Sequence, residues 1–146
     1  MACCVTIKGK EIREKLKEVK NSERFWLPLV PEKESDNVIY KIVHVEKSKI
    51  PPAIHTKDLD IYYILNGNAK FTYKGKLVNI YKKENDIDDT TYRGESIKGG
   101  ETFGIEKGDL IIIPKNTPHS VDATNSSISF LTIKTKQPKN TTNANL

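Results

Sequence analysis

Short apolar runs, rich in β-branched and aromatic residues, follow one another along most of this chain. Glycine, asparagine and proline separate most of these runs. Runs of this length with turn-forming residues at their ends are typical of β-strands rather than helices. The expected strands cover residues 38–45, 61–65, 69–73, 77–81, 101–105, 110–113 and 128–133. So many short strands predict an all-β sandwich or barrel.

The N-terminal segment follows a different period. Ile12, Leu16 and Val19 form one apolar stripe along a helix predicted over residues 8–20, which we expect to pack on the outside of the barrel. A chain of 146 residues is long enough for one core, so residues 1–135 are expected to form a single domain. The barrel itself should take up about residues 38–135. The polar end of the chain, residues 136–146, has no apolar pattern and is predicted to be a disordered tail.

The dipeptide Asn66-Gly67 is a turn signal typical of β-hairpins. Residues 61–65 are predicted to form the strand that enters this turn, and the return strand follows it. Asp60 and Tyr62 would share one face of that strand, because side chains alternate along a strand. Both faces carry apolar or aromatic side chains, so we expect the strand to be buried on both sides.

A second informative segment joins a glycine turn, a short strand and two prolines. Gly108 supplies the turn, and Leu110–Ile113 is too short and too β-branched for a helix. Pro114 and Pro118 prevent ladder pairing and make the following turn rigid. His119 lies directly after that turn, where a strand resumes. A histidine held in this way is a candidate metal ligand or base.

These two segments resemble the two motifs of the cupin family, G-x5-H-x-H-x3-4-E-x6-G and G-x5-P-x-G-x2-H-x3-N. In the second motif, Gly108, Pro114 and His119 match without a gap. Asn116 stands where the family has a glycine, a replacement that is compatible with a left-handed backbone. Ala123 replaces the closing asparagine.

The first motif is matched less completely. Asp60 takes the place of the family's glutamate, and His55 takes the place of its second histidine. Ala53 and Lys47 stand where the family has its first histidine and its opening glycine. The resemblance covers roughly residues 38–135. It is closer to small single-domain bacterial cupins of unassigned reaction, and it implies a double-stranded β-helix, or jelly-roll barrel, with a metal pocket.

The resemblance implies that His55, Asp60 and His119 are the metal ligands. Two imidazoles and a carboxylate suit a divalent transition metal such as iron, manganese, zinc or nickel, and they leave coordination positions open. Ala53 cannot coordinate a metal, so the affinity should fall or a water molecule should fill its position. Some cupins bind no metal and use the barrel only as a pocket or scaffold.

Two further residues are candidates for substrate binding. Tyr62 shares the face of Asp60, so its hydroxyl could reach the pocket, although core packing is an equally good explanation. Lys57 would share the face of His55 if the strand stayed regular, and could then attract an anion, or it could point to solvent. Two functional classes follow: a metal-dependent enzyme of oxygenase, isomerase or hydrolase type, and a non-catalytic module that binds a small ligand without a metal.

Composition and simple sequence signals limit the partners and the location that we expect. The net charge of +5 comes from scattered basic residues with no recognition motif, so we expect no nucleic acid as partner. No apolar run is long enough to span a membrane, and no signal peptide is evident, which predicts a cytoplasmic protein. The adjacent Cys3 and Cys4 cannot bridge each other in a relaxed chain, and S-acylation there is the less favoured alternative. Exposed edge strands need cover, so a homodimer is expected.

Overall fold

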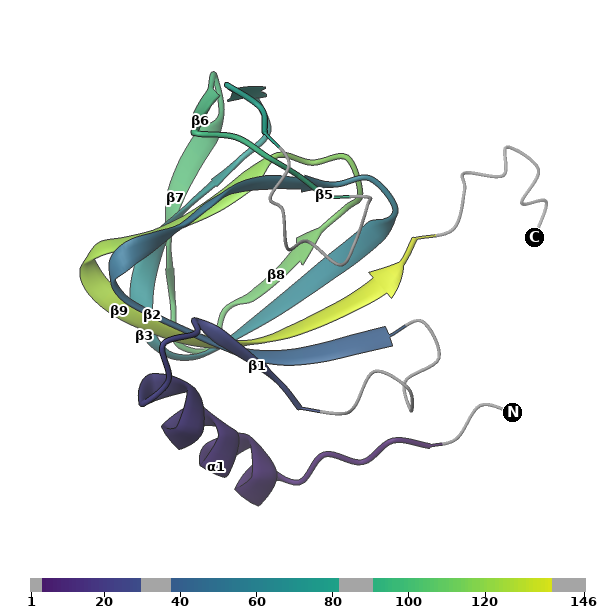
Figure 1. Ribbon diagram of the computed structural model, residues 1–146, viewed down its shortest axis with the longest axis vertical. Helices are drawn as coiled ribbons and strands as arrows, with labels where there is room; N and C mark the ends of the chain where they lie inside the picture. Colours follow the sequence, from purple (N-terminus) through teal and green to yellow (C-terminus); the bar gives the residue numbers. More distant parts are fainter. Residues whose placement is uncertain (1–3, 30–37, 82–90, 138–146) are drawn as a thin grey trace.

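The computed structural model describes residues 4–29, 38–81 and 91–137, and it shows one helix outside a barrel of antiparallel strands (Figure 1). The elements are α1 (Gly9–Lys20), β1 (Trp26–Pro28), β2 (Val38–His55), β3 (Asp58–Tyr73), β4 (Lys76–Val78), β5 (Thr91–Arg93), β6 (Ser96–Lys98), β7 (Glu101–Glu106), β8 (Leu110–Ile113) and β9 (His119–Lys136). The predicted all-β class and the cupin-type barrel are confirmed.

Three long strands, β2, β3 and β9, form the frame of the barrel. The main sheet has the order β1-β2-β9-β3-β7, with β5 paired to β2 and β8 paired to β3. The β2–β9 ladder shifts register between Glu46 and Ser48, and the β3–β9 ladder shifts between Ile64 and Asn66. Bulges of this kind bend a strand and increase its twist. The three strands therefore curve around the interior, as Figure 1 shows.

Alternate residues of the long strands fill the barrel with apolar side chains. Tyr62, Phe71 and Phe130 are all buried, and the Tyr62 and Phe130 rings lie 4.6 Å apart. Aromatic pairs at this separation add to the stability that burial alone provides. The remaining buried members of this cluster are Val43, Val45, Ile64, Ala69, Ile105, Ile113, Val121, Ala123 and Ile128.

The N-terminal helix agrees with its prediction to within one residue at its start. The Glu11 carboxylate accepts a hydrogen bond from the backbone amide of Lys8, which satisfies one of the free donors at the helix start. Val19 is almost fully buried, and α1 contacts β2. The helix thus packs its apolar stripe on the outside of the barrel, as predicted.

The hairpin predicted at Asn66-Gly67 is wrong, because β3 runs through both residues. Gly67 has a φ of 75° at the register shift, and a Cβ atom on it would lie 2.0 Å from the carbonyl oxygen of Ser127. The glycine therefore serves a bulge and a close approach to β9 rather than a reversal of the chain. The turn comes later, at Lys74 and Gly75, which both have positive φ.

Two other expectations also need correction. The second face of β3 is not buried, since Tyr63 is 45% exposed on the outside of the barrel. The C-terminal strand is longer than residues 128–133 and extends to Lys136, whose assignment to the tail is therefore wrong.

Most of the predicted disordered tail lies outside the described residues. Cys3 does so as well, whereas Cys4 is exposed and not in a disulfide.

Candidate metal site

The turn between β8 and β9 delivers His119 to the barrel interior. Asn116 has a φ of 61°, so the turn does use the left-handed backbone that its sequence position predicted. The backbone amide of Asn116 donates a 2.8 Å hydrogen bond to the carbonyl oxygen of His55. This bond ties the second motif to the end of β2. His119 then begins β9 and is only 4% exposed.

The other two candidate ligands lie on either side of the short connection between β2 and β3. His55 is the last residue of β2, and Asp60 is the third residue of β3. Only the two bend residues Thr56 and Lys57 separate the strands, and both side chains lie in the same interior cluster. His55 is 8% exposed and Asp60 is 1% exposed.

The three side chains converge on one point. The distance from His55 Nε2 to Asp60 Oδ2 is 3.2 Å, and from His119 Nε2 to the same oxygen it is 3.7 Å. Two ligands that each lie about 2.1 Å from a metal are separated by roughly 3.0–3.6 Å at ordinary coordination angles. The His55 separation lies within this range and the His119 separation exceeds it by about 0.1 Å, so a small movement of His119 would let the three side chains share an ion. In the described part of the chain, this is the one cluster of three such donors.

Hydrogen bonds orient both imidazole rings. The Nδ1 of His119 lies 2.9 Å from the carbonyl oxygen of Thr117, which can only accept, so this nitrogen carries the proton. The Nδ1 of His55 lies 2.8 Å from the Thr91 hydroxyl. When Nδ1 carries the proton, the lone pair is on Nε2, and both Nε2 atoms face Asp60. The Thr117 carbonyl thus holds His119 in the tautomer that metal binding requires. The Thr91 hydroxyl can donate or accept, so it orients the His55 ring without setting its tautomer.

Burial also keeps the imidazoles neutral. Desolvation lowers the pKa of His119 to about 4, although its hydrogen bond to the Thr117 carbonyl opposes this shift. Desolvation, together with the nearby Lys134, holds the pKa of His55 well below its usual range. Neutral imidazole is the form that binds a metal, so neither histidine has to lose a proton at neutral pH.

The cluster opens into a cavity of about 80 Å³. Ala53 lies in its wall, on the same face of β2 as His55, so the structure has a methyl group where the resemblance implies a third histidine. The lining residues are Phe25, Trp26, Lys41, Val43, Ile50, Pro51, Ala53, His55, Asp60, Tyr62, Arg93, His119, Ser120, Val121, Phe130, Thr132 and Lys134.

The structure separates the two candidate substrate-binding residues. Tyr62 lies in the cavity wall, and burial together with the charge of Asp60 raises the pKa of its hydroxyl well above its usual range. Tyr62 is therefore a neutral hydrogen-bonding group. Lys57 is exposed in the connection between β2 and β3, and it is not among the residues that line the cavity.

Sequence reasoning missed three basic residues in the cavity wall: Lys41, Arg93 and Lys134. Arg93 lies opposite Ala53 in the β2–β5 ladder, and Lys134 lies opposite Asp60 in the β3–β9 ladder. Residues opposite each other in a ladder share a face of the sheet. Their position could be inferred only from the register between distant strands.

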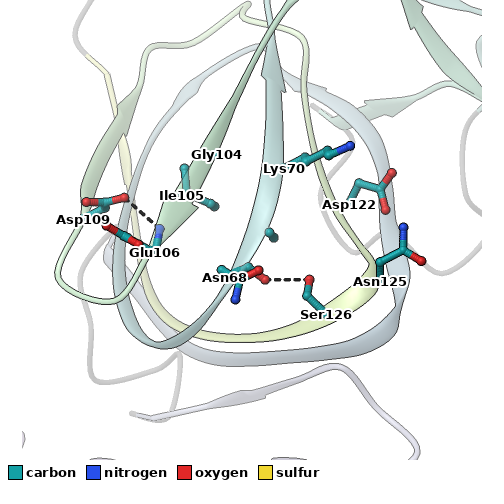
Figure 2. A pocket seen from close by; sticks show the side chains of 10 residues that line it. Asn68, Lys70, Gly104, Ile105, Glu106, Asp109, Asp122, Asn125 and Ser126 are labelled. Atoms are coloured by element: carbon teal, nitrogen blue, oxygen red, sulfur yellow. Dashed lines mark hydrogen bonds between the residues drawn. The ribbon is translucent and has the colours of Figure 1, made fainter.

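A larger cavity of about 490 Å³ lies elsewhere in the barrel (Figure 2). Its wall is largely polar, with Asn68, Lys70, Asp122 and Ser126 among its residues. The Ser126 hydroxyl donates to the Asn68 carbonyl oxygen, and the Asp109 carboxylate accepts from the amide of Glu106. None of the three candidate metal ligands lines this cavity.

Comparison with known proteins defines the class that this fold and site indicate. The Cupin family model matches residues 27–146, and the chain belongs to the cupin family. The comparison with curated proteins gives no match.

Solved structures share the fold at low sequence identity. A predicted oxalate decarboxylase from Thermotoga maritima is 17% identical, with a TM-score of 0.55, over 77% of this chain and 79% of that protein. A cupin protein from Bacteroides fragilis is 18% identical, with a TM-score of 0.52, over 86% and 90%. A DMSP lyase from Ruegeria pomeroyi is 18% identical, with a TM-score of 0.52, over 80% of this chain and 48% of the lyase. At these identities the likeness shows the fold alone.

Proposed function

We propose that this cupin holds a divalent transition metal on His55, Asp60 and His119 and acts there as a metal-dependent enzyme on a small molecule. The metal would be iron, manganese, zinc or nickel, all of which accept imidazole and carboxylate ligands. The observation that carries the proposal is the convergence of both Nε2 atoms on Asp60 Oδ2 in a buried pocket.

Each residue has a defined part in this proposal. Asp60 supplies the one negative charge among the three ligands, and the histidines supply neutral nitrogen donors. Thr91 and Thr117 fix the two rings. A bound ion would supply Lewis acidity or, if it is redox-active, electron transfer. Tyr62 offers a neutral hydroxyl at the cavity wall, where it would orient a ligand. We propose Lys57, exposed in the connection between β2 and β3, as a second substrate-binding residue that attracts an anion from outside the cavity.

A second function has its own support. Ala53 leaves the site with three ligands rather than four, which favours a metal-free module that only binds a small ligand. The two functions differ in one measurable property, namely whether the purified protein retains a stoichiometric metal.

The test is elemental analysis of protein purified without a histidine tag. His55→Ala and His119→Ala should each abolish metal retention, and Asp60→Ala should weaken it. His44→Ala is the matched control, because His44 is hydrogen-bonded to Ser129 at 2.8 Å and lies outside the cavity. Unchanged metal content in both ligand variants, with far-UV circular dichroism showing a folded barrel, would overturn the metal proposal and favour the binding module.

We also propose a homodimer formed through the outer face of β3 and β8. Leu110 and Ile112 are 61% and 59% exposed on β8, next to the exposed Tyr63 on β3. Among the described strands, β8 pairs only with β3, so its other edge is available to a second copy.

Light scattering should report a dimer, and the double variant Leu110→Lys, Ile112→Lys should be monomeric. Ile80→Lys, at a residue that is 60% exposed elsewhere, should remain dimeric. A monomeric wild-type protein would refute this interface.

Two further expectations belong with this proposal. We propose a cytoplasmic location. We also propose that the protein has no nucleic-acid partner, which the scattered positions of its basic residues support. No helix in the described part of the chain is long and apolar enough to cross a membrane.

A further inference from the structure

The cavity beside the candidate metal ligands carries more positive than negative charge. Among the described residues that line it, Asp60 is the only acid, whereas Lys41, Arg93 and Lys134 are bases. With a divalent ion in place, three cations and the ion would face one carboxylate, which leaves an excess of four positive charges. A partly enclosed space with this balance attracts anions strongly, because low-dielectric walls concentrate the field.

The three cations approach the site from different strands. Lys134 lies on β9 with its Nζ 3.4 Å from Nδ1 of His55, and it faces Asp60 across the β3–β9 ladder. Arg93 ends β5, and its Nη1 donates to the carbonyl oxygen of Pro51 at the cavity wall. Lys41 is held on β2 with its Nζ 4.1 Å from the centre of the Trp26 ring.

All three charges act on the same place. Lys41, Arg93 and Lys134 all line the cavity that His55 and Asp60 line. Lys134 lies opposite Asp60 and Arg93 lies opposite Ala53 in their ladders, so both approach the metal-binding end of the cavity. A metal on Nε2 of His55 requires the proton on Nδ1, which would then face the Lys134 ammonium at 3.4 Å. An anion that draws Lys134 toward the cavity would relieve this repulsion.

The size of the cavity limits the ligand. Its volume of about 80 Å³ has room for several water molecules, since one water requires roughly 10–15 Å³ on this measure. Pockets for drug-sized ligands are much larger, about 300–1,000 Å³. A small organic acid satisfies both the charge and the volume. Its carboxylate can bind the planar guanidinium of an arginine and the ammonium of a lysine at once.

We propose that this cavity takes a small carboxylate as the substrate or ligand of the site, with Lys134 and Arg93 as its charge partners. The proposal rests on the proposed function for the metal beside the carboxylate. The cations belong to the protein, so weaker carboxylate binding should persist without a metal. Loss of metal binding and loss of carboxylate binding can therefore be told apart.

The experiment is calorimetric titration with malonate, its neutral analogue malonamide, and inorganic phosphate. Each is added to metal-loaded and to metal-free protein, with metal content measured separately. Malonate should bind, and malonamide should not. Lys134→Met should weaken malonate binding about tenfold or more, as expected for a lost charge contact near a partly buried anion. Lys134→Arg, which keeps the charge, should restore most of the affinity.

The matched control is Lys49→Met, which removes one positive charge from an exposed position on β2 outside the cavity. It should leave malonate binding unchanged. Equal binding of malonate and malonamide, or equal effects of Lys134→Met and Lys49→Met, would overturn the proposal. Tighter binding of phosphate than of malonate would refute the carboxylate class. If the protein binds malonate but cannot be loaded with metal, the carboxylate site is supported and the proposed metal site is refuted.

Discussion

The backbone amide of Asn116 is hydrogen-bonded to the carbonyl oxygen of His55, and this bond links the two halves of the candidate site. Asn116 adopts a φ of 61°, which most side chains resist and which asparagine and glycine accept. The turn therefore positions His119 and the end of β2 together. A substitution at Asn116 that disfavours this backbone should therefore change the positions of both histidines.

We expect Asn116→Gly to keep both the fold and the metal affinity, because glycine adopts this backbone freely. Asn116→Val should destabilise the protein by about 1–3 kcal/mol, since a β-branched residue at positive φ is strained. Thermal unfolding of both variants, with metal content alongside, provides the measurement. Equal unfolding temperatures for the two variants would contradict the role given to this turn.

Gly67 allows a second comparison between paired variants. Gly67→Ala places a methyl group against the Ser127 backbone at positive φ, so it should cost about 2–4 kcal/mol or prevent folding. Gly104→Ala is the control, because a Cβ atom there meets nothing within 4 Å. Chemical denaturation should show a large loss of stability for the first variant and little change for the second. A mild effect at Gly67 would mean that β9 can move away from β3.

The fate of Asn66-Gly67 shows what local sequence can and cannot specify. The dipeptide does mark an irregular backbone, but a bulge and a hairpin use the same conformational freedom. Only the pairing with β9, more than 50 residues later, decides between them. The helix, β7 and β8 were predictable, because their periodicity or their flanking turns are local.

The candidate ligands were also predictable, since the motif spacing places His55, Asp60 and His119 together and the structure does so. The basic residues of the cavity were not. β9 continues beyond the apolar run 128–133 and includes Lys134. The register between β9 and β3 places Lys134 opposite Asp60, and therefore at the interior. Arg93 depends in the same way on the pairing of β5 with β2.

The metal-free protein should lose stability as the pH falls below about 6.5. Both histidines have a folded-state pKa below the unfolded value, so the unfolded state binds more protons and stability decreases with acid. For His119, with a pKa of about 4, the loss at pH 5 relative to pH 7.5 should be about 2 kcal/mol. Denaturant titrations at the two pH values measure it. His119→Gln should show a smaller difference between them, and an unchanged difference would contradict the assignment.

A metal-ligating side chain at position 53 should increase the metal affinity of the site. Ala53 lies opposite His119 in the β2–β9 ladder and shares the face of His55, so an imidazole there would enter the same cavity. Ala53→His should tighten metal binding about tenfold or more, because a fourth ligand replaces a methyl group. Ala53→Gln has a side chain of similar size and a poorer ligand, and it should not tighten binding. A thermal melt first checks that each variant is folded. Competition with a chelator of known affinity then measures the metal affinity of both variants. Equal affinities for the histidine and glutamine variants would show that position 53 does not reach the ion.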